Sequence, residues 1–294
     1  TSSSGSETAS SFPGADTEQP MSIVADLHTH TTVSDGTLTL DRLVEVANEA
    51  DLEAVAVTDH DRYHPALSAP VEQRNGVTIV RGIELRVDAG SQRLDLLGYG
   101  LEPTAALTAE VERIQQNRID RGRQLIENVE SYLGVDLHLE AREGLGRPHI
   151  ARAVLESEAD YDEFGAVFDD LIGDDGPCFV PRDVPDFETG RELLSEACAL
   201  VGLAHPLRYD DPEAALSCCA ELDAVERYYP YDRPLSPEDP DALDPVLVEN
   251  AIAEYDLLAT GGSDAHEDLL AKDGLPAEAW ERVRDRLPAS VSID

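Results

Sequence analysis

Two histidines, His28 and His30, stand one residue apart directly after a short apolar run, and Asp35 follows five residues later. Such a cluster of polar side chains adds little to a hydrophobic core, because polar groups are costly to bury. Imidazole and carboxylate groups without thiolates are instead typical ligands of Mn, Zn and Fe. The stretch therefore predicts part of a metal site, which needs further ligands from elsewhere in the chain.

Other histidines and carboxylates follow similar apolar runs. These candidates are His60, Glu84, His205, Asp264 and His266. Each run is short and rich in Val, Leu and Ala, as a buried strand is. The carboxyl ends of parallel strands lie on one face of a sheet or barrel, where active sites are built. We therefore expect these side chains to converge.

Three aspartates, Asp26, Asp59 and Asp61, lie beside these candidate ligands. They have two interpretations. They could orient the imidazole rings of metal ligands, as carboxylates commonly do. They could equally accept hydrogen bonds from the backbone where a strand turns into a loop.

Strands that alternate with helices predict an α/β body with a parallel sheet, open or closed into a barrel. Thr39 is expected to cap a helix that begins at Leu40, and another helix is expected over 241–255. Residues 103–190 break the alternation with a long helix over 110–132 and several shorter ones.

Three parts of the chain are predicted from this pattern. Residues 1–20 are expected to form a flexible tail, because they are rich in Ser, Thr, Gly, Glu and Pro. Residues 21–102 and 191–294 are expected to form the barrel body. Residues 103–190 are expected to form a helical insertion that contributes to the active site.

Six short motifs in this order resemble the PHP family, named for polymerase and histidinol phosphatase. They are H-T-H at 28–30, S-D-G-T at 34–37, T-D-H-D at 58–61, G-I-E at 82–84, A-H-P at 204–206 and S-D-A-H at 263–266. R-P-H-I-A at 147–151 and N-R-I-D-R-G-R at 117–123 further resemble a subgroup of AMP or 3′,5′-nucleoside bisphosphate phosphatases and RNA 5′-exonucleases. The resemblance implies a distorted (β/α)7 barrel with a mostly helical insertion.

The resemblance also implies a centre of three divalent ions, Mn foremost and Zn or Fe as alternatives. The implied ligands are His28, His30, Glu84 and Asp264 for one ion, Glu84, His149 and His205 for the second, and Asp35, His60 and His266 for the third. The expected chemistry is attack of a metal-bound hydroxide on a phosphate ester, with no protein nucleophile. His64 and His138 are left without a role.

Four arginines are candidate phosphate ligands: Arg118, Arg121, Arg147 and Arg208. A planar guanidinium binds phosphate oxygens well. Each of the four could equally pair with a surface carboxylate. The expected partner is a small phosphorylated nucleotide or a short oligonucleotide.

Three functions remain open from the sequence. The first is a phosphatase of nucleotide monoesters, and the second is a 5′-to-3′ exonuclease of short RNA or DNA. An exonuclease needs a basic or aromatic track for several nucleotides, and Tyr228, Tyr229 and Tyr231 form the only aromatic cluster. The third is a non-catalytic metal-binding module.

The charge balance is extreme, with 61 acidic against 22 basic residues and a formal net charge of −39. Such self-repulsion opposes the compact state unless molar salt screens it. We therefore expect a salt-rich cytoplasm, as in a halophile, and the absence of cysteine pairing motifs is typical of a reducing compartment. Binding to a membrane or broadly to duplex nucleic acid is not expected.

Overall fold

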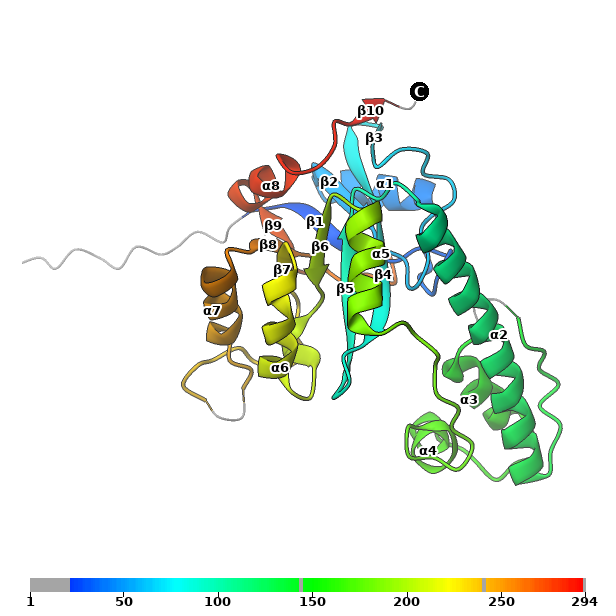
Figure 1. Ribbon diagram of the computed structural model, residues 1–294. Coiled ribbons are helices and arrows are strands. Elements are labelled where there is room, and N and C mark those ends of the chain that lie inside the picture. Colours follow the sequence, from blue (N-terminus) through cyan, green and yellow to red (C-terminus); the bar gives the residue numbers. More distant parts are fainter. Residues whose placement is uncertain (1–21, 143–144, 240–241, 293–294) are drawn as a thin grey trace, which may run out of the picture.

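The computed structural model describes residues 22–142, 145–239 and 242–292, so the tail expected over residues 1–20 lies outside the described residues. The body is a nearly closed α/β barrel (Figure 1). Its strands, in spatial order, are β8 (Leu258–Gly261), β7 (Ala224–Tyr228), β6 (Leu200–Leu203), β5 (Arg93–Tyr99), β4 (Val77–Asp88), β2 (Ala54–Val57) and β1 (Ile23–Thr29). A bridge between Thr29 and Ala265, just after β8, brings the two ends together. The predicted α/β barrel is confirmed.

Among the seven barrel strands, one departs from the predicted parallel arrangement: β5 runs antiparallel to both β4 and β6. The physical reason is the short connection between β4 and β5. It turns tightly at Gly90, whose φ of +85° favours glycine, and no helix carries the chain back across the barrel. The amino end of β5 therefore lies beside the carboxyl end of β4.

Three short strands extend the sheet at its margins: β3 (Val71–Arg74), β9 (Leu275–Pro276) and β10 (Val291–Ser292). The β3–β4 hairpin turns at Asn75 and Gly76, both with positive φ, which is the favoured geometry of a two-residue hairpin. The sequence analysis had not predicted these three strands.

Helices cover the outside of the barrel (Figure 1). They are α1 (Leu40–Glu49), α2 (Ala105–Leu133), α3 (Arg147–Glu156), α4 (Phe164–Val167), α5 (Phe187–Ala197), α6 (Pro212–Ser217), α7 (Val246–Tyr255) and α8 (Ala277–Arg284). Of these, α2, α3 and α4 project away from the barrel at the lower right of Figure 1. Short helical turns follow at 168–172, 206–208 and 218–221. As predicted, Thr39 caps α1 by accepting a hydrogen bond from the Arg42 backbone N–H.

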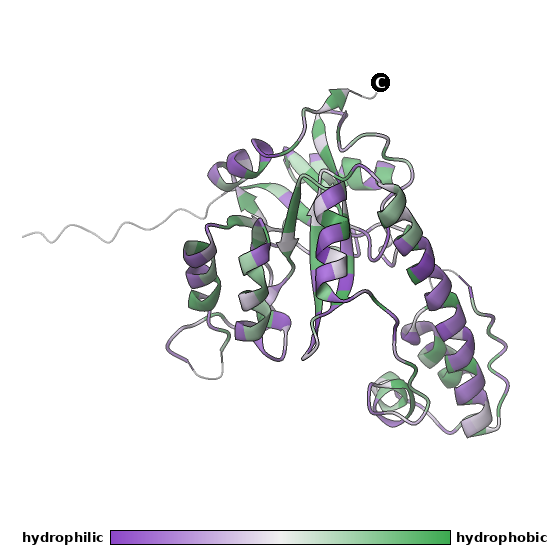
Figure 2. Ribbon diagram, in the orientation of Figure 1, coloured by the Kyte–Doolittle hydropathy of each residue, from purple (hydrophilic) through white to green (hydrophobic). Residues whose placement is uncertain are grey.

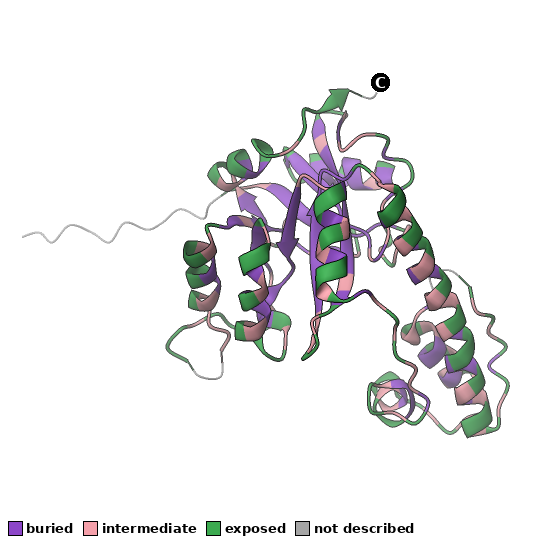
Figure 3. Ribbon diagram, viewed as in Figure 1, coloured by how far each residue is buried: buried purple, intermediate pink, exposed green. Residues whose placement is uncertain are grey.

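The barrel strands are apolar and buried along almost their whole length (Figures 2 and 3). Aliphatic side chains fill the core on both faces of the sheet, and Tyr99 and Trp280 are its largest buried aromatic residues. This packing fixes the strand ends, and therefore the polar side chains that follow them, in one rigid frame. The four cysteines are free thiols.

The chain leaves the barrel after β5 and returns at the neighbouring strand β6. The two crossings are tied together, because Glu102 N donates to Ala197 O at 2.8 Å and Ala199 N donates to Tyr99 O at 2.9 Å.

The long helix α2 takes part in two apolar cores. Its first turns pack on the barrel through Leu107, Val111 and Ile114, and its last turns pack with α3 and α4 through Leu125, Ile126 and Val129.

Candidate metal centre

The first group of polar side chains lies at the carboxyl ends of β1 and β4 and just after β8. His28 Nε2 is 3.5 Å from both Glu84 Oε2 and Asp264 Oδ1. His30 Nε2 is 3.4 Å from the same Glu84 oxygen and 3.0 Å from the same Asp264 oxygen. His28, His30 and Glu84 thus form a compact buried set of potential ligands, and Asp264 Oδ1 lies beside both imidazole rings.

This group fits a metal ion. Ligands at about 2.0–2.1 Å in a tetrahedron are separated by about 3.3–3.5 Å, which matches the distances from Glu84 to both rings and from Asp264 to His28. His28 Nε2, His30 Nε2 and Glu84 Oε2 are buried and have no hydrogen-bond partner. Buried polar atoms without partners are rare in stable proteins, and a shared cation would satisfy all three.

Glu84 extends the centre to a second group. Its Oε1 lies 3.1 Å from His205 Nε2, while Asp95 Oδ2 lies 3.8 Å from the same nitrogen. Glu84, Asp95 and His205 form a compact buried set of potential ligands. Asp95 was not among the candidate ligands predicted from the sequence.

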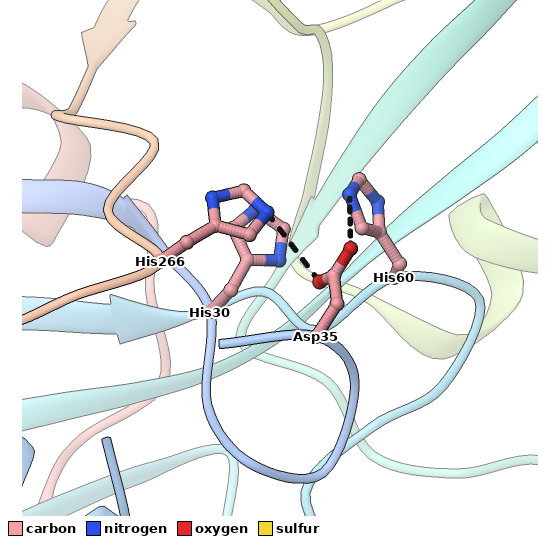
Figure 4. Close-up of side chains that lie close together, drawn as sticks. All are labelled: His30, Asp35, His60 and His266. Carbon is pink, nitrogen blue, oxygen red and sulfur yellow. Dashed lines mark ion pairs between the residues drawn. The ribbon is translucent and has the colours of Figure 1, made fainter. Parts of the chain in front are cut away.

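The third group is Asp35, His60 and His266, joined by His30. Figure 4 shows the Asp35 carboxylate facing both His60 and His266, at 3.8 Å and 3.4 Å from their Nε2 atoms. The His30 ring stands next to both of the other rings, with centroids 4.4 Å and 4.3 Å away. This group is more exposed than the first and opens toward a pocket.

The charges in the centre shift the protonation of its side chains strongly. Burial alone would raise the pKa of the Glu84 carboxyl, but His60, His28 and His205 outweigh it and hold this pKa well below its usual value. Burial would lower the pKa of His60, but the Glu84 carboxylate at 2.7 Å raises it to about 9. Without metal, protons therefore balance the charge of the carboxylates.

A further carboxylate, Glu226 on β7, holds the first ligand in place. Its Oε1 is 3.0 Å from His28 Nδ1, and its Oε2 accepts the His205 backbone N–H at 2.7 Å. A carboxylate on the far nitrogen fixes the ring orientation of a metal-binding histidine. Glu226 was not predicted from the sequence. The available signal was a lone acidic residue within an apolar strand.

The three aspartates beside the ligands accept hydrogen bonds where strands turn into loops. Asp26 accepts the backbone N–H of Ser263 and Ala271, both at 2.9 Å. Asp59 accepts the Thr31 backbone N–H at 2.8 Å and the Ser34 hydroxyl at 2.6 Å. Asp61 accepts the Arg86 backbone N–H at 3.1 Å.

His149 is not brought into the three groups among the described residues. It lies in the first turn of α3, where its Nδ1 accepts the Gly146 backbone N–H at 3.2 Å. Its role as a ligand stays a prediction. His64 Nδ1 accepts the Ala66 backbone N–H, and His138 is exposed beside Asp136.

A pocket of about 620 Å³ opens over the centre, between the barrel and the insertion. Seven of the chain's 22 basic residues line it: Arg86, Arg93, Arg118, Arg121, Arg147, Arg182 and Arg208. All four arginines selected from the sequence are among them. Burial, followed by the neighbouring arginines, lowers the pKa of Arg121 to about 10. Four carboxylates, Asp35, Asp95, Asp174 and Asp264, line the same pocket, so its arginines outnumber its carboxylates.

The four selected arginines also contact acceptors within the protein. Arg118 lies 3.3 Å from Asp61 Oδ2, Arg147 lies 2.7 Å from Asp174 Oδ1, and Arg121 Nε donates to Val180 O at 2.6 Å. Arg208 Nη1 donates to Asp264 Oδ2 at 3.1 Å. Arg118, Arg147 and Arg208 therefore pair with carboxylates while they line the pocket, whereas Arg121 contacts a backbone carbonyl. Their role as phosphate ligands stays a prediction.

The tyrosine cluster does not form an open stacking surface. The Tyr229 hydroxyl donates to Asp264 Oδ2 at 2.8 Å, and Tyr229 itself is 8% exposed. The Tyr231 hydroxyl accepts the Leu207 backbone N–H at 3.2 Å. Tyr228 lies under the Arg227 guanidinium, 4.7 Å from its ring centroid.

Comparison with known proteins places these features in a family. The PHP domain family matches residues 26–171. A 3′,5′-nucleoside bisphosphate phosphatase of Chromobacterium violaceum is 29% identical over 193 residues, 63% of this chain and 67% of that protein. A phosphoribosyl 1,2-cyclic phosphate 1,2-diphosphodiesterase of Eggerthella lenta is 27% identical over 262 residues, 83% and 94% of the two chains.

The 5′-3′ exoribonuclease Rnm of Escherichia coli is 28% identical over 199 residues, 64% of this chain and 67% of that protein. Among solved structures, a proposed metal-dependent phosphoesterase of Bifidobacterium adolescentis superposes with a TM-score of 0.70 at 22% identity, covering 92% of this chain and 99% of that one. Fold and site define this protein as a metal-dependent phosphoesterase. The chain carries a PHP domain, which is matched over residues 26–171.

Proposed function

We propose that the protein hydrolyses phosphate monoesters of nucleotides, of the AMP or nucleoside 3′,5′-bisphosphate type. The observation that carries this proposal is the pocket, in which candidate metal ligands on the barrel side face seven arginines. In a chain with a formal charge of −39, such a concentration of arginines suits an anionic substrate. The similarity to a nucleoside bisphosphate phosphatase supports the nucleotide.

We further propose that the centre holds three divalent ions, Mn foremost. The first group would hold one ion, Glu84 with His205 and Asp95 a second, and Asp35 with His60 and His266 a third. Bound ions of this kind activate water and neutralise phosphate oxygens, so that no protein nucleophile is required. Arg208, which already contacts Asp264, and Arg118 would orient the phosphate from the pocket side.

The exonuclease is the second candidate, and the similarity to exoribonuclease Rnm favours it. Both candidates use the same ions on a phosphate ester. The deciding experiment measures phosphate release in molar KCl with Mn²⁺ from AMP, adenosine 3′,5′-bisphosphate, histidinol phosphate and a 5′-phosphorylated trinucleotide. Release from mononucleotides that stops on chelation is expected. Mononucleotides liberated from the oligomer without free phosphate would favour the exonuclease instead.

Two variants test the role of His149. His149→Ala should lose bound metal and activity together if His149 is a ligand, because an ion loses a direct bond. His138→Ala is the matched control, since it removes an exposed imidazole from the same insertion. Unchanged metal content in His149→Ala would leave Asp95 as the ligand that completes the second site.

A further inference from the structure

Asp61 lies one residue after the candidate ligand His60, and its side chain is almost fully buried. Its backbone adopts a left-handed φ of +53°. Its N–H donates to Glu84 O at 2.7 Å, and its carboxylate Oδ1 accepts the Arg86 N–H at 3.1 Å. Asp61 is therefore fixed twice to β4, the strand that carries the central Glu84.

The other oxygen of Asp61 faces the insertion. Its Oδ2 lies 2.5 Å from Arg182 Nη2 and 3.3 Å from Arg118 Nη1. The Asp61 carbonyl accepts from Gln115 Nε2 at 2.9 Å. Gln115 and Arg118 belong to the middle of α2, and Arg182 belongs to the segment that returns from the insertion to α5. One residue thus joins the metal-binding loop to both the outgoing and the returning chain.

The charges in this cluster do not balance. One carboxylate cannot neutralise two guanidinium groups, so an excess positive charge is held at the wall of the pocket that Arg118 and Arg182 line. Both side chains are mostly buried, at 17% and 20% exposure. Since a buried charge without a counter-ion is costly, the pair is suited to a bound anion.

We propose that Asp61 is a positioning residue that aims Arg118 and Arg182 at the substrate phosphate. The inference rests on the proposed phosphoesterase function and adds to it a dependence of substrate binding on the docked insertion. Asp61 itself does not touch the substrate. Its carboxylate sets the direction of two guanidinium groups from different segments, which the rotational freedom of their long side chains would otherwise leave unaligned.

The test compares Asp61→Asn with Asp59→Asn. Asparagine keeps the shape and the acceptor for the Arg86 N–H but removes the charge that holds the arginines. We expect KM for AMP and Kd for inorganic phosphate to rise about tenfold, the size of one lost hydrogen bond to a charged group, with unchanged bound Mn²⁺. Asp59 directly precedes His60 in the sequence and is also buried. Its carboxylate accepts hydrogen bonds from Thr31 and Ser34. Its variant should leave the phosphate Kd unchanged.

A second arm separates positioning from general damage. In the background Arg118→Ala with Arg182→Ala, Asp61→Asn should add no further loss of phosphate binding, because the groups through which it acts are gone. An additive loss, or a wild-type phosphate Kd in Asp61→Asn, would overturn the proposal. If Asp61→Asn does not fold, Asp61→Glu takes its place and should weaken phosphate binding through the displaced charge. If wild-type protein hydrolyses no nucleotide, the function fails, while the phosphate Kd still decides the role of Asp61.

Discussion

His28 Nδ1 lies 3.0 Å from Glu226 Oε1, and both side chains are completely buried. This pair leaves the opposite ring nitrogen, Nε2, directed at Glu84 and Asp264. Glu226 also accepts the His205 backbone N–H, so it supports two candidate ligands.

We predict that Glu226→Gln lowers the affinity for Mn²⁺ by about 10- to 100-fold, the range for carboxylates that orient metal-binding histidines. Glutamine keeps the size of the side chain but removes the charge that favours the required tautomer. Isothermal titration calorimetry measures the affinity. Glu249→Gln, which removes a partly exposed carboxylate on α7, is the control. Equal affinities in all three proteins would contradict the prediction.

Tyr229→Phe tests how Asp264 is oriented. The Tyr229 hydroxyl and Arg208 both bind Oδ2, which leaves Oδ1 facing His30 at 3.0 Å. We expect Mn²⁺ affinity to fall by about tenfold. Tyr231→Phe should lower thermal stability without affecting metal binding, because its hydroxyl serves only the Leu207 backbone N–H in the described hydrogen bonds. Unchanged Mn²⁺ affinity in Tyr229→Phe, together with a loss of affinity in Tyr231→Phe, would show that Tyr229 packs against its neighbours without orienting Asp264.

Stability should depend on pH in opposite ways with and without metal. The His60 pKa is raised from 6.5 to about 9 by Glu84. In metal-free protein, the stability that protonated His60 contributes is fully present below pH 6.5 and is lost as pH rises through about 9. Metal binding requires neutral imidazoles, so the added stability from Mn²⁺ should instead grow with pH. Melting temperatures measured between pH 6 and about 9, once with EDTA and once with Mn²⁺, give the two slopes of stability against pH. Parallel slopes would refute the prediction.

Salt should stabilise the protein strongly. The formal charge of −39 is screened over about 3 Å in 1 M salt but over about 10 Å in 0.1 M salt. We therefore expect the melting temperature to fall continuously as KCl is diluted from molar concentration. Sucrose at equal osmolality serves as the control for excluded-solute effects. A melting temperature that does not respond to KCl would remove the argument for a salt-rich cytoplasm.

The positions of His28, His60 and Glu84 could be predicted from the sequence because they lie in or shortly after β1, β2 and β4, which run parallel to one another. Asp95 escaped this rule because it lies near the amino end of β5, the strand that runs antiparallel. An apolar run in the sequence does not reveal whether its strand runs parallel or antiparallel to the neighbouring strands. The short connection to β4 was the usable signal, since no helix fits within it.

The insertion was harder to predict in detail. Arg118 and Arg121 were selected because they stand three apart on one helix, and both line the pocket. Arg182 was missed because it lies outside regular structure, where periodicity gives no orientation. His149 was selected by motif, yet its ring caps its own helix in this structure. Contacts between distant segments decide such positions, and no local pattern encodes them.

The two crossings between barrel and insertion are neighbours, tied by the backbone hydrogen bonds of Glu102 and Ala199. The chain between β5 and β6 is therefore a single cassette, a segment whose two ends lie side by side on the barrel. The outer part of that cassette, which comprises the last turns of α2 with α3 and α4, has an apolar core of its own. A gene could exchange this outer part in one recombination event and keep the α2 and α5 side chains that pack on the barrel. New substrates would then arise by replacing this outer part while the inherited chemistry persists.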